Sequence, residues 1–284
     1  MCSPEKKARD CYSGTIDPIE SNDFLEMMVL DGCFIIQFLL FFGSRNIGRK
    51  VLRDHPLGRM DRDRVMLQKI CADLFMLENQ IPYFVLELLF KFFRNPSGGR
   101  DVSLPIYAVT TFSQTLEIGS FYFEAEDISE SYGAECLHLL DLVRSIFIPP
   151  DLPYRYRKER FPFTQENWYR PLRTIPRISQ LPRAGIMVNP RKKDRFLVVQ
   201  FVKSLGVIEM PNLSLNELMC SFLVNCVAFE QSYNTHSKHL SVYALFLDWL
   251  VNTAQDVEYL CEHRVIDNYM RTMLLASSTI WART

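Results

Sequence analysis

The stretch that decides the fold is Asp73-Leu-Phe-Met-Leu-Glu-Asn-Gln-Ile-Pro-Tyr-Phe-Val-Leu-Glu87. Apolar residues recur at helical spacing from Val65 to Ile81, and a second apolar run extends from Tyr83 to Phe93. Pro82 stands between the two runs. Because proline lacks a backbone N–H and disfavours the α region for the residue before it, we expect a break at Asn79-Gln80-Ile81. The sequence therefore predicts two buried helices that meet at a polar break.

Three polar residues, Glu78, Asn79 and Gln80, occupy this predicted break. Proline frees backbone groups of the preceding turn, and buried polar groups in proteins are normally paired. We therefore expect the three side chains to satisfy those backbone groups, and a ligand site is the alternative. Together with Pro82 they remain candidate specificity positions.

Upstream, the segment from Phe24 to Phe42 is apolar at 15 of its 19 positions. Its length would just permit a membrane span, but Glu26 and Asp31 would each cost roughly 2.5 to 3.5 kcal/mol near a bilayer centre. We expect instead a helix surrounded by other elements of a folded core, in which Asp31 needs a buried partner or a gap to water. Residues 1–22 are predicted to be a flexible leader.

Charge is segregated further along the chain. Residues 101–143 hold eight Asp or Glu and no Lys or Arg, and residues 151–195 hold twelve Lys or Arg against four acids. The basic segment also contains six prolines, which is typical of an exposed loop. We expect this loop, including Arg155, Arg157 and Lys158, to pack against or gate the acidic segment, or to present a partner surface. Nucleic-acid binding through its basic and aromatic residues is the alternative, although no known nucleic-acid-binding signature accompanies them.

The last third of the chain predicts a small β element and further helices. Phe196–Phe201 and Val207–Met210 flank Ser204-Leu-Gly206, which indicates a β-hairpin. Capping-box patterns at Ser214–Glu217 and Thr253–Asp256 predict two helix starts. We therefore expect a mainly α fold, a single multi-helix domain over residues 23–284 with a small antiparallel β-hairpin, and an α+β fold as the fallback.

Composition and motifs narrow the function. Lys and Arg number 32 against 33 Asp and Glu, so the chain as a whole lacks the charge of a nucleic-acid-binding protein. Eight cysteines without a CxxC pair, and no signal peptide, indicate reduced thiols inside the cell. No hydrolase, P-loop, dinucleotide, zinc-protease or kinase motif is present, and His236 with His239 lacks further zinc ligands at a familiar spacing. We expect no catalytic residue, cofactor or metal, and the enzyme alternative relies on Asp31 and Glu78 as buried carboxylates.

Several motifs together resemble the plant domain of unknown function 247 family. Besides the stretch around Pro82 they are Met28–Phe34, His138–Val143, Leu181–Ile186 and Ala228–Gln231, and the resemblance runs in order over roughly residues 24–270. The resemblance implies a mainly helical plant protein without accepted catalytic residues. Family members commonly end in a single transmembrane helix, and some grass members are linked to self-incompatibility, a recognition process.

The chain departs from the family pattern at both ends. The Gly-Pro-Tyr-His motif of the usual N-terminal segment is missing, and the chain stops at Trp281–Thr284, where members usually continue into the membrane anchor. We expect either a truncated chain or a soluble derivative, cytoplasmic as given and membrane-bound if an anchor was removed. The expected function is a non-enzymatic recognition or signalling module with an unknown protein partner.

Overall fold

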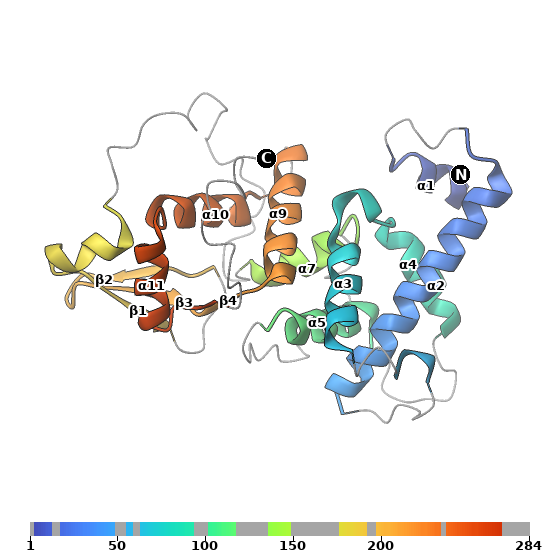
Figure 1. The fold of residues 1–284 in the computed structure, drawn as a ribbon. Coiled ribbons are helices and arrows are strands. Elements are labelled where there is room, and N and C mark those ends of the chain that lie inside the picture. The colour runs from blue at the N-terminus through green and yellow to red at the C-terminus, as the bar shows by residue number, and fades with distance from the viewer. Residues whose placement is uncertain are drawn as a thin grey trace. The chain divides into compact units, whose positions relative to one another are not determined.

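The computed structural model describes residues 3–12, 18–48, 55–58, 63–93, 102–117, 136–148, 176–191, 197–233 and 237–268. The chain forms two compact units. Figure 1 colours the described elements by residue number, from blue at the N-terminus to red at the C-terminus. Unit 1 comprises residues 1–115 and 122–143, and unit 2 comprises residues 116–121 and 144–284. The expectation of a single helical domain over residues 23–284 stays a prediction, because this grouping does not measure independent folding.

Unit 1 is organised around the long helix α2 (Ser21–Asn46), which packs against α5 (Leu104–Thr115) and α4 (Tyr83–Phe93). Its buried face carries aromatic and aliphatic side chains, among them Phe24, Ile36, Phe38 and Leu39. Gly43 lets the backbones of α2 and α5 approach closely, since a Cβ atom there would lie 2.8 Å from the carbonyl oxygen of Tyr107. The core of unit 1 therefore depends on one small residue as well as on apolar burial.

Part of the predicted leader is a short helix, α1 (Pro4–Arg9), which packs on unit 1. The Arg9 guanidinium lies over the ring of Phe24 at 4.3 Å and donates a hydrogen bond to the carbonyl of Ile19 at 2.9 Å. Lys7 lies over the ring of Phe84 at 4.1 Å. Cationic side chains thus fix α1 to the beginnings of α2 and α4.

The predicted break at Pro82 is confirmed. Helix α3 (Arg64–Phe75) begins at the N-cap Asp63, whose side chain accepts from the backbone N–H of Met66 at 3.0 Å. A short 3-10 turn, η3 (Leu77–Asn79), follows, and α4 begins directly after the proline. A second 3-10 turn, η1 (Pro56–Gly58), precedes α3.

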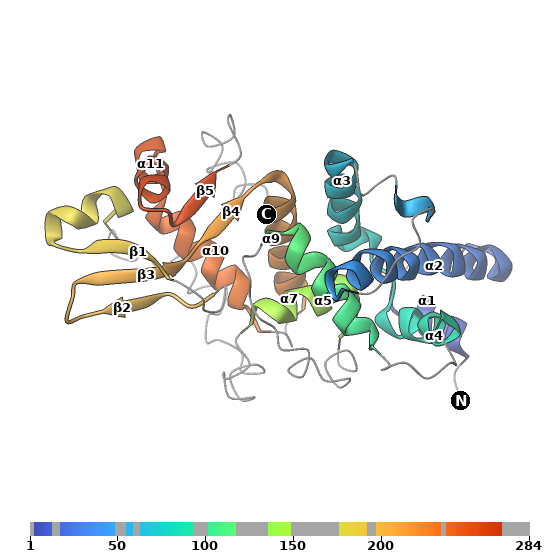
Figure 2. The ribbon, with the colours of Figure 1, turned by 90° about the horizontal axis from the view of Figure 1, so that it is seen from below.

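Helix α7 (Leu139–Phe147) contributes residues to both units. Unit 2 also contains η5 (Ile178–Ala184), α9 (Glu217–Ser232), α10 (His239–Leu250) and α11 (Ala254–Glu262), which Figure 2 shows from a second side. The predicted capping box at Thr253 is confirmed. The box predicted at Ser214 is wrong, because Ser214 lies in a strand and Asn216 caps α9 by accepting from Met219 N–H at 2.8 Å.

A small mixed sheet in unit 2 has the order β1-β3-β2. Strands β2 (Gln200–Val202) and β3 (Val207–Pro211) pair antiparallel, which confirms the predicted hairpin. Gly206, at φ +64°, supplies the left-handed conformation in the connection between them. Strand β1 (Met187–Arg191) pairs parallel with β3, and a separate parallel pair joins β4 (Leu213–Leu215) to β5 (Ile266–Asn268). The prediction of a mainly α fold with a small β element is confirmed.

Strand β1 lies at one edge of the three-stranded sheet. The backbone N–H of Met187 donates to the carbonyl of Gly206 on the β3 side at 2.9 Å. Backbone N–H groups of successive residues in a strand point to opposite sides, so the N–H position of residue 190 points away from β3. This residue is Pro190, which has no N–H.

Candidate functional site

The polar break before Pro82 is held together by Gln80. Its side-chain amide is buried, and Nε2 donates to the carbonyls of Leu74 and Met76, both at 2.8 Å. Its Oε1 accepts from the backbone N–H of Leu140 at 3.0 Å, in the first turn of α7. One side chain therefore satisfies backbone groups at the end of α3 and at the beginning of α7, which is the structural role that the sequence predicted.

The neighbouring candidate positions are arranged differently. Asn79 Nδ2 donates to the carbonyl of Asp73 at 3.1 Å, but Asn79 and Glu78 are exposed. Pro82 is buried and forms an isolated β-bridge with His138. Of the polar triplet, only Gln80 is buried, and its hydrogen-bonding groups are used within unit 1.

Two expectations about charged residues are wrong. Asp31 is exposed rather than buried, and Glu78 is also exposed, so the pair of buried carboxylates on which the enzyme alternative relied is not formed. Helix α2 is not surrounded on every face either, because several of its apolar side chains are exposed. Arg155, Arg157 and Lys158 lie outside the described residues, as does His236.

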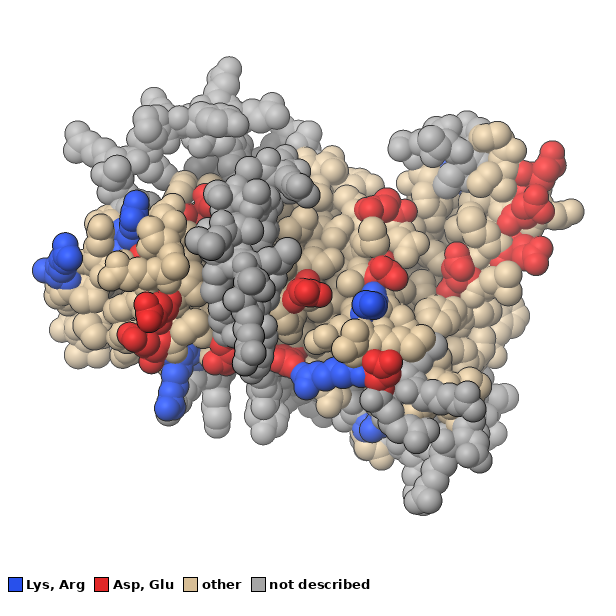
Figure 3. All heavy atoms as spheres, in the orientation of Figure 1, with Lys and Arg blue, Asp and Glu red and all other residues tan. Residues whose placement is uncertain are grey.

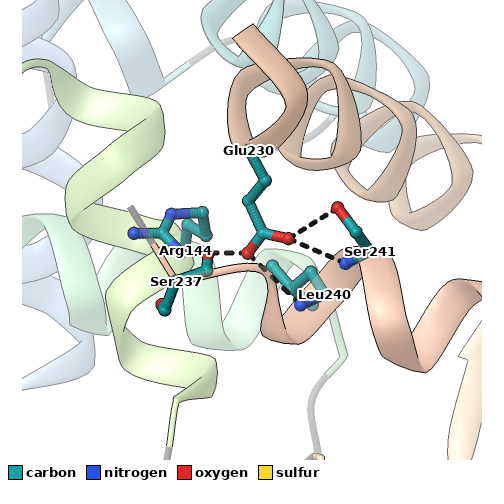
Figure 4. A network of polar contacts seen from close by, with 5 residues as sticks. All are labelled: Arg144, Glu230, Ser237, Leu240 and Ser241. Carbon is teal, nitrogen blue, oxygen red and sulfur yellow. Dashed lines mark hydrogen bonds and ion pairs between the residues drawn. The ribbon is translucent and has the colours of Figure 1, made fainter. Parts of the chain in front are cut away.

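A second polar cluster lies inside unit 2, around Glu230 of α9 (Figure 4). Its carboxylate is fully buried and contacts Arg144 of α7, with Nη1 and Oε1 3.0 Å apart. It also accepts from the backbone N–H groups of Leu240 at 3.2 Å and Ser241 at 2.8 Å, and from the Ser241 hydroxyl at 2.7 Å. The cluster joins three helices through one carboxylate.

Glu230 takes the place of an N-cap for α10. The residue at the N-cap position, Lys238, makes no side-chain capping bond, so the free N–H groups of the first turn are satisfied from α9. Burial raises the pKa of Glu230, whereas the Arg144 charge and the hydrogen bonds from Ser241 and Leu240 act to lower it. This set of donors stabilises the charged form, which burial alone would disfavour.

Asp256 forms a third buried cluster, at the start of α11. It accepts from the hydroxyl of Ser179 at 2.5 Å, from the hydroxyl of Thr253 at 2.7 Å and from the backbone N–H of Asn252 at 3.1 Å. Burial acts to raise the pKa of Asp256, but the hydrogen bonds from Ser179, Thr253 and Asn252 outweigh it and hold the pKa below its usual range. Asp256 thus connects η5 to α11 within unit 2.

Three of the described cysteines, Cys11, Cys71 and Cys220, do not offer an activated nucleophile. Burial raises the pKa of the Cys71 thiol to about 12, and burial also raises the pKa of Cys11 and Cys220. A raised pKa leaves the neutral thiol dominant at physiological pH, and the thiolate is the reactive form. Within the described part of the chain, no group of three or more His, Cys, Asp or Glu side chains could hold a metal ion.

Exposed apolar side chains are most numerous on α2. Leu25, Val29, Leu30 and Phe34 are each at least 41% exposed, and Leu30 reaches 62%. We call these four residues, together with the exposed acids Glu26 and Asp31, the outer face of α2. In Figure 3, acidic side chains are prominent at the end of unit 1 where Figure 1 places the first half of this helix. The sequence did not predict this exposed face, because an almost continuous apolar run predicts burial on all sides.

Helix α2 also has the length and composition of a membrane-spanning segment over Ser21–Arg45, with 44% of its most apolar window buried in the fold. Among the described residues it is the one helix with these properties. A core helix of a soluble protein meets the same criterion.

Fold and polar clusters together define a class: a mainly helical protein whose buried polar groups hold helix ends, with an exposed apolar and acidic helix face. The family model described as "Plant protein of unknown function", domain of unknown function 247, matches residues 1–278. The chain therefore belongs to this family, as the resemblance predicted.

Curated relatives agree with this assignment. The UPF0481 protein At3g47200 of Arabidopsis thaliana is 29% identical over 275 residues, which cover 92% of this chain and 54% of the relative. The putative UPF0481 protein At3g02645, from the same plant, is 21% identical over 347 residues, covering 95% of this chain and 63% of the relative. The chain thus spans little more than half the length of the first relative. No solved structure matches it.

Proposed function

We propose that the protein is a non-enzymatic recognition module that binds a protein partner. The observation that carries this proposal is the outer face of α2, on which four large apolar side chains are exposed within one helix. Exposed apolar residues scattered singly are normal on folded proteins, whereas several large ones concentrated on one helix make that helix a candidate interaction surface.

The interior of the described structure supports a binding role over a catalytic one. Gln80, Glu230 and Asp256 are buried and accept or donate hydrogen bonds to backbone groups at helix ends. A general acid or base needs a proton-transfer position within reach of a substrate, and these side chains are committed to the fold instead.

The finer parts of the expectation remain proposals. A signalling role of the kind linked to self-incompatibility, and association with a membrane, are what the family resemblance implies for this chain. The nucleic-acid alternative depends on the basic loop at residues 151–195, most of which lies outside the described residues, and no observation favours it.

The test is affinity purification of the full chain from plant tissue, followed by reciprocal purification from the side of each candidate partner. We expect at least one protein to be recovered in both directions and to bind the purified chain directly with a measurable dissociation constant. Turnover of a small-molecule substrate by the purified chain, abolished by a variant that leaves its fold intact, would contradict the proposal.

A further inference from the structure

We propose that the outer face of α2 docks a basic, amphipathic segment of a partner protein. This inference rests on the proposed recognition function and adds to it the surface and the chemistry of the partner. Three observations support it. They are the spacing of the exposed apolar side chains, the sign of the charges among them, and the contacts by which cations of the chain's own α1 bind at the start of α2.

The apolar part of the face consists of two rows. Leu25 and Val29 lie four residues apart along α2, and Leu30 and Phe34 form a second pair with the same spacing. Residues four apart lie one above the other on a helix, but positions 25 and 30 lie about 140° apart around it, so the two rows are separate. Glu26 lies in line with Leu30 and Phe34, between this row and the other, and apolar side chains at this spacing can pack against the apolar side of an amphipathic helix.

The charges on the same stretch are all negative. Asp23, Glu26 and Asp31 are exposed, and no Lys or Arg occurs between Ser21 and Phe42. Glu26 precedes Leu30 in its row by four residues, and Asp31 lies one residue beyond Leu30. Acidic side chains thus lie among the exposed apolar side chains of α2, so cations on a partner would gain favourable interactions while its apolar side chains are buried.

The chain itself shows how cations dock at this end of unit 1. Arg9 and Lys7 of α1 lie over the aromatic rings of Phe24 and Phe84, at 4.3 and 4.1 Å. Arg9 also forms an ion pair with Glu5 at 3.0 Å, and Glu5 accepts a hydrogen bond from the hydroxyl of Ser21 at the start of α2. A short basic helix therefore already packs at the beginning of α2, against the buried ring of Phe24.

The same charges disfavour a lipid surface as the occupant. Membrane-bound amphipathic helices carry Lys and Arg on their polar side, because the cytoplasmic leaflet is negatively charged. The acids among these apolar side chains would be repelled by such a leaflet. A cationic protein segment satisfies both the apolar and the acidic parts of the face.

The experiment uses the full chain and a synthetic 18-residue peptide that has Leu at helical spacing and Lys at all other positions. Binding is followed by fluorescence anisotropy at low and at high salt. We expect the peptide to bind the wild-type chain, with affinity falling as salt rises. A matched peptide with Glu in place of Lys is expected to bind at least tenfold more weakly.

Two double variants test the two halves of the face. Glu26→Lys with Asp31→Lys reverses the charge of two exposed acids on α2. Leu30→Ser with Phe34→Ser removes the apolar pair beside them. Each double variant is expected to weaken peptide binding at least tenfold. The matched controls are Glu258→Lys and Leu205→Ser, which change an exposed acid and a 72% exposed apolar residue in unit 2 and should leave binding within twofold. Circular dichroism checks that every variant stays folded.

Several outcomes would overturn the inference. These are no binding of the Leu/Lys peptide, equal binding by all variants, or binding to phosphatidylcholine or phosphatidylglycerol vesicles that is lost in the Leu30→Ser, Phe34→Ser variant. Self-association in sedimentation experiments that the same variant abolishes would assign the face to a second copy instead. If a reciprocally confirmed partner binds all variants equally, the recognition function survives and only this surface assignment fails.

Discussion

Gln80 makes three hydrogen bonds to backbone groups of other residues, so its loss should destabilise unit 1 strongly. Gln80→Leu leaves the buried Leu140 N–H and the carbonyls of Leu74 and Met76 without these partners. A buried group left unsatisfied costs about 1 to 3 kcal/mol, and we expect at least that loss in the free energy of unfolding, measured with urea. Glu78→Gln, at an exposed neighbour, is the control and should change stability by less than about 0.5 kcal/mol.

Removing one partner of the buried Arg144–Glu230 pair should be costly. Arg144→Met leaves the Glu230 carboxylate buried without its counter-charge, and loss of one partner of such a pair costs about 3 to 5 kcal/mol. We expect the double variant with Glu230→Leu to lose less than the sum of the two single variants. A double-mutant cycle by chemical denaturation measures this difference, and strict additivity would show that the two side chains are not coupled.

The lowered pKa of Asp256 predicts a pH-dependent stability. A carboxyl whose pKa is lower in the folded state stabilises the fold above its unfolded pKa, about 3.9, and this contribution disappears as the pH falls through the folded value. We expect Asp256→Asn to be less stable than wild type at pH 7 and the gap to shrink below about pH 4. Urea unfolding at several pH values tests this, with Asp267→Asn, an exposed aspartate, as the control. A gap that stays constant down to pH 3 would contradict the prediction.

Single residues could be predicted where the cause is local. Pro82 and the polar residues before it indicated both the break and the structural role of Gln80, because proline acts on its immediate neighbours. Arg144 and Glu230 are 86 residues apart, and no local pattern connects them. The Ala228–Gln231 motif did mark Glu230 as part of the family resemblance, but its partner is defined only by tertiary packing.

Among the helices, the contact between α2 and α5 should be sensitive to one methyl group. Gly43→Ala would place a Cβ atom 2.8 Å from a backbone oxygen of Tyr107, which cannot move without shifting α5. Overpacking of this kind costs about 1 to 3 kcal/mol. Gly32→Ala is the matched control, since its Cβ would meet Leu89 Cδ1, the end of a flexible side chain, and alanine favours the helix. We expect thermal denaturation to show a lower Tm for Gly43→Ala than for Gly32→Ala, and the opposite order would contradict the packing.

Elements were predictable to the extent that their signals are local. Gly206 and the flanking apolar runs indicated the β2–β3 hairpin, and the box at Thr253 indicated α11. The parallel pairing of β1 with β3 has no comparable signal, because it joins strands through a longer connection. Ser214 was misassigned as a cap since Ser214, Asn216 and Glu217 all suit a helix start, and the pairing of β4 with β5 decides where α9 begins.

At the scale of the whole molecule, the two compact units predict separate local stabilities. Gln80→Leu should increase hydrogen exchange of amides in α3, α4 and α5 of unit 1, and leave α9, α10 and α11 of unit 2 closer to wild type, because cooperative opening follows compact units. Arg144→Met should give the reverse pattern. Hydrogen exchange measured by mass spectrometry tests both, and equal deprotection throughout by either variant would show one cooperative unit.

Pro190 has a consequence for how the protein behaves at high concentration. The open edge of a sheet can pair with the edge of another copy, which is a common route to aggregation. Residue 190, one of the outward positions on β1 that would donate to an incoming strand, is proline, so regular intermolecular β-pairing is blocked at this point. The association proposed for this chain therefore uses a helix, through the outer face of α2, whereas Pro190 protects the edge strand β1 from intermolecular β-pairing.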